Sequence, residues 1–169
     1  SLIHKAAEVG DVETLRRLLS EGVSPDATDY LDRTPLHRLC RSSHDLAACF
    51  KLLRDAGANL EATDDLGYTP LHCAVRSGSV GLLSLLVQSG VNVDAATTGG
   101  TTALHFAVRM MATNGIEVLL AAGASLNLRE GHGLTAFSLA LLSRTNRWMW
   151  PLFLRAGAEI PTDNTERYI

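Results

Sequence analysis

The chain has 169 residues, of which 46% are apolar and 20% charged, and its formal net charge is −3 at pH 7. This balance suits a globular protein with a sizeable core and argues against a nucleic-acid binder, which would need a basic surface. No apolar run approaches the ~20 residues that span a bilayer, so the sequence predicts no direct insertion into a membrane.

A tetrapeptide recurs along the chain at a nearly constant period. It reads TPLH at residues 34–37 and 69–72, TALH at 102–105 and TAFS at 135–138, so its copies begin 35, 33 and 33 residues apart. A weaker copy, SLIH, occupies residues 1–4. A glycine that follows each apolar run keeps the same period: Gly22, Gly57, Gly90, Gly123 and Gly157. The chain is therefore built of repeats.

The tetrapeptide has the features of a helix start. Threonine is a favourable N-cap residue, and proline fits the first helical position because its missing amide proton is not needed there. Histidine falls at the third helical position, from which its side chain can reach back to the cap. With a period of 33 residues, the pattern resembles the ankyrin repeat, a β-turn followed by two helices.

That resemblance covers essentially the whole chain and implies an all-α ankyrin-repeat solenoid. We expect five stacked helix–turn–helix repeats with β-hairpin loops, forming one monomeric domain over residues 1–169. The repeats fall at about residues 1–28, 29–63, 64–96, 97–129 and 130–163, and a short tail follows.

Three repeats depart from the regular pattern. The second has two extra residues within 41–45, and Asp32 replaces the usual turn glycine, which aspartate can do because it tolerates the left-handed conformation. In the fourth, Met111 stands where glycine is usual between the helices. In the fifth, Pro151 falls inside the second helix, which we expect to be kinked or to begin late.

No constellation of residues indicates catalysis or a cofactor. The sequence has no phosphate-binding glycine loop and no G-x-S-x-G or H-E-x-x-H motif, so we expect no enzyme activity. The repeated histidines His4, His37, His72 and His105 lie on four successive repeats and could not converge on one metal ion, so we expect them to cap helices within their repeats. Asp64 and Asp65 precede a turn glycine and are interpreted as a solvated turn.

The cysteines indicate the cellular compartment. Cys40, Cys49 and Cys73 are widely spaced within helical patterns, so we interpret them as reduced core thiols. Together with the lack of a signal-peptide pattern, they predict an intracellular, cytoplasmic location, with the nucleus left open.

Positions that vary between repeats point to a partner site. In ankyrin proteins, partners usually dock on the concave side, which the hairpin tips and first helices form. Three successive first helices carry arginine at the same position, four residues after the histidine. The resemblance implies a protein or peptide partner, and the row of arginines predicts that this partner carries acidic or phosphorylated residues. The predicted contact residues are Tyr30, Arg33, Arg41, Tyr68, Arg76, Arg109, Met110 and His132.

The function that this implies is non-catalytic protein binding, as a scaffold, adaptor or recognition module. One alternative is a regulatory ankyrin segment of a larger enzyme or membrane channel. A narrower one is a reader of modified lysine, which needs an aromatic cage around the cation. Trp148, in the fifth repeat, could cap the end of the stack or meet a partner, and both interpretations stay open.

Overall fold

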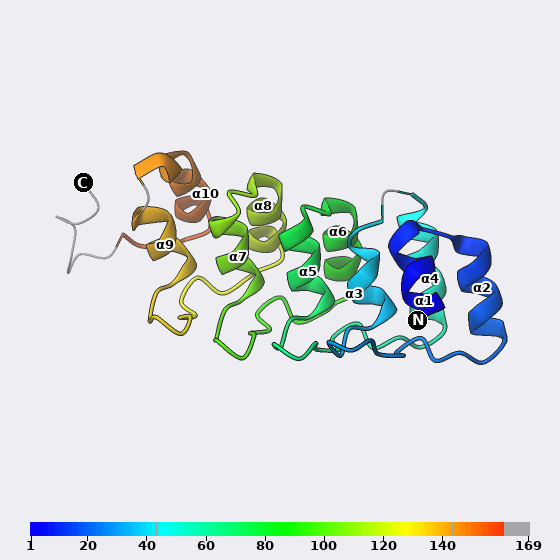
Figure 1. Ribbon diagram of the computed structural model, residues 1–169. Coiled ribbons are helices and arrows are strands. Elements are labelled where there is room, and N and C mark those ends of the chain that lie inside the picture. The colour runs from blue at the N-terminus through cyan, green and yellow to red at the C-terminus, as the bar shows by residue number, and fades with distance from the viewer. Residues whose placement is uncertain (43, 143, 161–169) are drawn as a thin grey trace. The chain divides into compact units, whose positions relative to one another are not determined.

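The computed structural model describes residues 1–42, 44–142 and 144–160. In this part of the chain, ten α-helices and one 3-10 helix follow one another in pairs joined by short turns (Figure 1). The first three pairs are α1 (Leu2–Val9) with α2 (Val12–Ser20), α3 (Pro35–Leu39) with α4 (Leu46–Asp55), and α5 (Pro70–Ser77) with α6 (Val80–Gln88). The others are α7 (Ala103–Arg109) with α8 (Thr113–Ala121), and α9 (Ala136–Leu142) with η1 (Arg144–Met149) and α10 (Trp150–Arg155).

The predicted all-α class is confirmed, but the loops between pairs are simpler than hairpins. No strand occurs in the residues described, and two isolated antiparallel bridges join Ala96 to Thr102 and Arg129 to Thr135. Each loop contains a turn closed by backbone hydrogen bonds, such as Asp29 N–H to Arg33 O at 3.0 Å and Asp32 N–H to Asp29 O at 3.1 Å.

The described residues group into two compact units. The N-terminal unit is Ser1–Asn92 and holds α1 to α6, and the C-terminal unit begins at Val93 and holds α7 to α10. Within the first unit α1 packs on α3 and α3 on α5, while α2 and α6 pack on α4; within the second, α7 packs on α9. That residues 1–169 form one domain stays a prediction.

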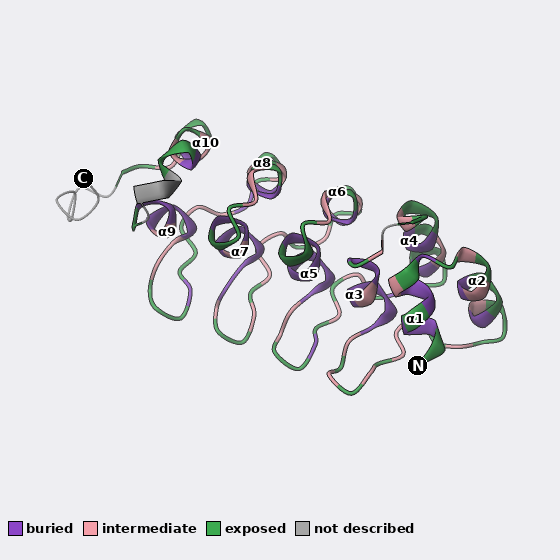
Figure 2. Cartoon of the chain, turned by 45° about the horizontal axis from the view of Figure 1, so that its top comes forward, coloured by how far each residue is buried: buried purple, intermediate pink, exposed green. Residues whose placement is uncertain are grey.

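The tetrapeptides begin helices as predicted. Thr34, Thr69 and Thr102 are the N-caps of α3, α5 and α7, and each forms a capping box with the histidine three residues later. In the first of these the Thr34 amide donates to His37 Nδ1 at 3.1 Å. The first helices carry much of the buried surface, and α5 is buried at residues 70–75 (Figure 2).

The second helices bury the stripe that the repeat register requires. The residue four before each marker glycine is buried in every pair: Leu18, Leu53, Leu86, Leu119 and Phe153. The residue seven before it is also buried in the first four pairs, and Trp150 in the fifth is half-buried, with Nε1 donating to Ala140 O at 3.2 Å. The register is therefore correct. The three cysteines are buried and free, as predicted.

The extra residues of the second repeat shorten its first helix. α3 has five residues against eight in α5, and Asp45 enters α4 with φ 44°. Ser43 lies outside the described residues. The Ser42 hydroxyl donates to His44 O at 2.7 Å, and this carbonyl lies directly against Gly10, in the turn between α1 and α2. The predicted break in regular geometry is confirmed here.

The proline of the fifth repeat also acts as predicted. η1 occupies the place where a second helix would start, and α10 has six residues against nine in α6 and α8. Pro151 lies in the first turn of α10, where its missing amide proton costs nothing.

Asp32 has the left-handed backbone that the sequence predicted for it, with φ 56°. No helix in the described ranges is long and apolar enough to cross a bilayer.

We predict that Gly10→Ala destabilises the protein more than Gly22→Ala. Both glycines have a left-handed backbone, at φ 77° and 84°, so each alanine carries a strain of about 1–2 kcal/mol. At position 10 the new Cβ would also lie 2.1 Å from the His44 carbonyl oxygen, whereas nothing lies within 4 Å at position 22. In urea unfolding we expect a loss of about 1 kcal/mol for Gly22→Ala and at least ~2 kcal/mol for Gly10→Ala. Equal losses would show that the contact with the His44 carbonyl does not constrain position 10.

Candidate functional site

Buried imidazoles of three repeats connect their repeat to the loop that follows it. Nε2 of His4, His37 and His105 donates to the carbonyl of a residue in the next turn, at 2.7, 2.9 and 3.1 Å. Burial lowers the pKa of His37 and His105 and keeps these rings neutral. The prediction that the histidines cap helices within their own repeats was thus incomplete. No group of His, Cys, Asp or Glu side chains in the described ranges could hold a metal ion.

Carboxylates order the turns that carry the predicted contact residues. Asp29 Oδ1 accepts from the amides of Leu31 and Arg33 at 2.9 and 3.1 Å. Asp64 Oδ1 accepts from the amides of Leu66 and Tyr68 in the same way, at 3.0 and 2.9 Å. The side chain of Asp64 is fully buried, so its interpretation as part of a solvated turn was wrong.

The same carboxylates bind arginines of the N-terminal unit. Arg38 pairs with Asp29 Oδ2, and Arg33 Nε lies 3.5 Å from Asp64 Oδ2. Burial raises the pKa of Asp29, but the hydrogen bonds from Arg38 and from the two turn amides outweigh it and hold that pKa at about 2. Both guanidiniums are largely buried, at 17% and 22% exposed. Arg33 and Arg38 therefore belong to the framework of the turns.

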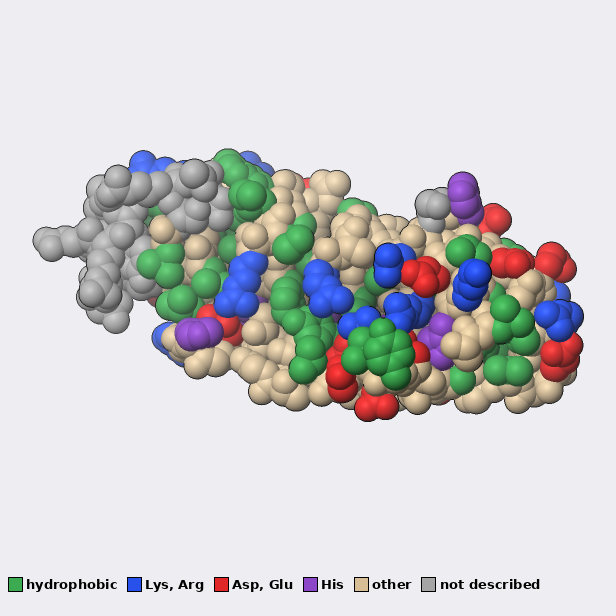
Figure 3. Space-filling model, viewed as in Figure 1, with side chains coloured by type: hydrophobic (Ala, Val, Ile, Leu, Met, Phe, Trp, Pro, Cys, Tyr) green, Lys and Arg blue, Asp and Glu red, His purple; other side chains and the backbone are tan. Residues whose placement is uncertain are grey.

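Arg41 and Arg76 are more open to a partner. Arg41 follows α3; its side chain is 63% exposed and its Nη1 lies 3.1 Å from Glu8 Oε1 on α1. Arg76, on α5, has its guanidinium carbon 5.0 Å from the centre of the Tyr68 ring. Within the part of the chain that the structure describes, Arg76 has no carboxylate within ion-pair distance. Basic and acidic side chains lie side by side over α1 and α3 (Figure 3).

The C-terminal unit repeats this chemistry with different partners. Arg109 Nη2 lies 2.6 Å from Glu130 Oε2, and His132 Nδ1 lies 3.3 Å from Glu130 Oε1. Burial raises the pKa of Glu130, but the hydrogen bonds from Arg109 and His132 outweigh it and lower that pKa. Met110 follows Arg109, with about half of its side chain exposed.

Three of the predicted contact arginines already have a partner within the fold. Arg33, Arg41 and Arg109 each pair with a carboxylate in the described part of the chain. Tyr30 is 87% exposed at its turn tip. It lines a hollow of about 350 Å³ together with Glu8, Asp29 and Arg38 on the same face of the N-terminal unit.

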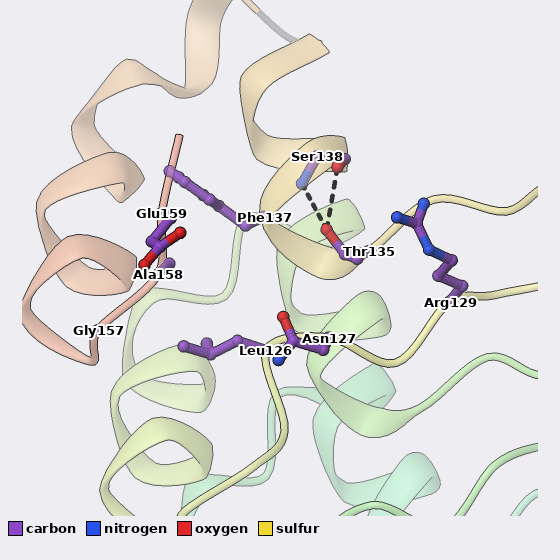
Figure 4. A pocket seen from close by; sticks show the side chains of 9 residues that line it. All are labelled: Leu126, Asn127, Arg129, Thr135, Phe137, Ser138, Gly157, Ala158 and Glu159. Carbon is purple, nitrogen blue, oxygen red and sulfur yellow. Dashed lines mark hydrogen bonds between the residues drawn. The ribbon is translucent and has the colours of Figure 1, made fainter. Parts of the chain in front are cut away.

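The C-terminal unit has a hollow that the sequence did not predict. It measures about 380 Å³ and lies at the start of α9 (Figure 4). Its walls are Leu126, Asn127, Arg129, Thr135, Phe137, Ser138, Gly157, Ala158 and Glu159. Ser138 stands where the other tetrapeptides have histidine, and its hydroxyl lies 3.0 Å from that of Thr135. Ser138 is the sequence feature that could have indicated this hollow, because the other repeats have the larger imidazole at this position.

Comparison with known families settles the class of protein. Residues 45–130 match the family model described as ankyrin repeats (3 copies), and residues 3–53 match the one described as ankyrin repeats (many copies). The chain belongs to the ankyrin repeat family, whose members are protein–protein interaction modules and typically not enzymes. The chain is also similar to the potassium channel GORK of Arabidopsis thaliana, with 46% identity over 50 residues. That stretch is 30% of this chain and 6% of the channel's length.

We predict that Asp29→Asn flattens the dependence of stability on acidic pH. The folded pKa of Asp29 is about 2, below its ordinary value of 3.8. The charged carboxylate therefore stabilises the fold fully above about pH 4, and this contribution is lost as the pH falls through about 2. Asp29→Asn should be less stable than the parent at neutral pH and lose less stability between pH 4 and 2, measured by urea unfolding. Asp55→Asn, which removes an exposed carboxylate on α4, should keep the parent's profile. A parental profile in Asp29→Asn would contradict the assignment.

Proposed function

We propose that this chain is a non-catalytic protein-binding module of the cytosol, a scaffold, adaptor or recognition domain, and that its N-terminal unit binds an acidic or phosphorylated residue of the partner. The observation that carries this is Arg76, which has an aromatic neighbour and, among the residues described, no carboxylate within ion-pair distance. The C-terminal unit would add Arg109, Met110 and His132 to the contact surface.

The arginines of the N-terminal unit differ in how many of their guanidinium donors are already used within the fold. Arg33 and Arg38 are largely buried against their aspartates and are committed to the turns. Arg41 gives one nitrogen to Glu8 and is otherwise mostly exposed. A guanidinium has five N–H donors in a planar fork, so Arg41 and Arg76 both have donors left for a carboxylate or phosphate.

Arg41 and Arg76 share one register position in consecutive repeats, whose first helices α3 and α5 pack on one another. A hydrogen bond from Cys73 lowers the pKa of Cys40 to about 7, and the charges of Arg76 and Arg41 also act in that direction. Cys40 is the C-cap residue of α3. A partner with a phosphate or with paired carboxylates would offer acceptors to these guanidiniums.

The Tyr68 ring supports this function over the modified-lysine alternative. A methylated lysine would need the open face of an aromatic ring, but Arg76 already lies over Tyr68 at 5.0 Å. The stacked ring instead restrains the guanidinium, so less side-chain entropy is lost when an anion binds.

A second candidate function rests on the match with the potassium channel. Because 50 residues of this chain are similar to part of a much longer protein, the chain could serve as a regulatory ankyrin segment of a larger channel or enzyme. Sequencing the full transcript tests this: an open reading frame that encodes a channel or enzyme domain before or after these residues supports it, and one that encodes neither contradicts it.

We predict that Arg76→Ala weakens binding to acidic peptides. The test uses an immobilised array of acidic, phosphorylated and neutral peptides. A hydrogen bond to a charged group contributes about 1.5–3 kcal/mol, so the loss should be roughly tenfold or more in Kd, with little change in melting temperature. Glu8→Gln should increase the affinity for the same peptides, because it removes the carboxylate that competes for Arg41.

The matched control is Arg54→Ala. Arg54 lies on α4, is exposed, and pairs with its neighbour Asp55, so its loss removes the same charge from another surface. Binding that depends on Arg54 as strongly as on Arg76 would reduce the effect to net charge and overturn the proposed site. So would an array on which acidic and neutral peptides bind equally.

A further inference from the structure

Met111 has a backbone conformation that methionine rarely adopts. It lies in the turn between α7 and α8 with φ 53°. The same place between α1 and α2 is taken by Gly10, and between α5 and α6 by Gly78, at φ 77° and 71°. The turns are otherwise equivalent: Met111 N–H donates to Val108 O at 3.1 Å, and Gly78 N–H to Val75 O at 3.1 Å. The turn needs a left-handed residue and gains nothing from a methionine.

Packing does not explain the methionine either. The side chain of Met111 is 57% exposed and that of Met110 is 52% exposed. A left-handed residue with a Cβ is strained, and such residues persist mainly where function uses them. Two adjacent methionines are thus held outward at a turn where glycine would be more stable.

The surroundings of the two methionines indicate which chemistry would meet them. Arg109 precedes them, and its side chain is 40% exposed although one nitrogen binds Glu130. Leu142, the last residue of α9, is half exposed, and α9 packs on α7. The end of α7 and the turn after it therefore present exposed apolar side chains that follow a partly exposed arginine in the sequence. An apolar side chain next to an acidic one complements both features.

We propose that Met110 and Met111 form an anchor site for a leucine, methionine or phenylalanine of a partner segment that also carries an acidic residue for Arg109. The inference rests on the proposed function in that the partner is an acidic protein segment. Methionine suits this role because its unbranched thioether adapts to apolar surfaces of different shape. The strained backbone of Met111 directs its side chain to solvent, where the partner can cover it.

The methionines themselves provide the measurement. The chain has three; Met110 and Met111 are exposed, whereas Met149, in η1, is buried. With 13C-methyl methionine in the full chain, three NMR signals can be followed while acidic peptides are added. The probes are acidic peptides identical except for one position, which is serine, alanine, leucine, methionine or phenylalanine. The larger apolar residues should shift the signals of Met110 and Met111 and leave that of Met149 in place.

The variant Met111→Gly should change stability and binding in opposite directions. Relief of the left-handed strain should raise the melting temperature by about 2–4 °C. Loss of the side chain should weaken the binding of the leucine peptide roughly tenfold in Kd and leave the binding of the serine peptide unchanged. Met111→Leu keeps an apolar side chain and should retain most of the affinity. Leu154→Ala, which removes a 44% exposed side chain from α10, should leave the affinity unchanged.

The outcomes separate this inference from the proposed function. If Arg76→Ala weakens acidic peptides but Met111→Gly does not, the anchor site is wrong and the proposed function stands. If apolar peptides shift Met110 and Met111 equally well with and without acidic residues, the acidic contact with Arg109 is wrong and the anchor site as proposed is overturned, whereas Arg76→Ala tests the proposed function separately. Signals of all three methionines that move together, or none that move with any peptide, overturn the anchor site.

Discussion

The fold depends on a neutral imidazole that forms hydrogen bonds in two directions. In His37 and His105, Nδ1 accepts from the amide of the capping threonine and Nε2 donates to a carbonyl of the next loop. These loops contain no strand in the residues described, so their carbonyls cannot all be satisfied by a ladder of backbone bonds. A buried carbonyl without a partner costs about 1–3 kcal/mol. Burial, which keeps the ring neutral, thus helps to fix each loop on the preceding helix.

The turns impose a second constraint, because they also need acceptors for tightly spaced amides. Asp29 and Asp64 supply them, and a buried carboxylate in turn requires a cation. Arg38 and Arg33 answer that requirement. Two arginines of the N-terminal unit therefore neutralise carboxylates of its turns. Fewer positive charges are left for a partner than the number of arginines suggests.

The sequence predicted those features that follow from period and local geometry. Helix starts, the shortened helix before residues 41–45 and the late start at Pro151 depend on residues close together in the chain. The charge pairs could not be predicted in this way, because Glu8 and Arg41 are 33 residues apart and meet only after the helices pack. Nor was the burial of Asp64 visible in its polar neighbours. The fourth repeat has Thr97 at the turn position that Asp29 and Asp64 occupy in the second and third. The sequence alone therefore shows that the turn of the fourth repeat lacks this carboxylate.

Equivalent positions in this scaffold have different electrostatic surroundings. Arg41, Arg76 and Arg109 share one register position, yet the first binds a glutamate of the preceding first helix, the second lies on an aromatic ring, and the third binds a glutamate of the following turn. A repeat fold fixes where a side chain leaves the backbone but not what neutralises it. Specificity can therefore change by single substitutions at the turn, without any change in the helices. The proposed recognition depends on features that the fold itself does not use: the guanidinium of Arg76 and the backbone strain of Met111.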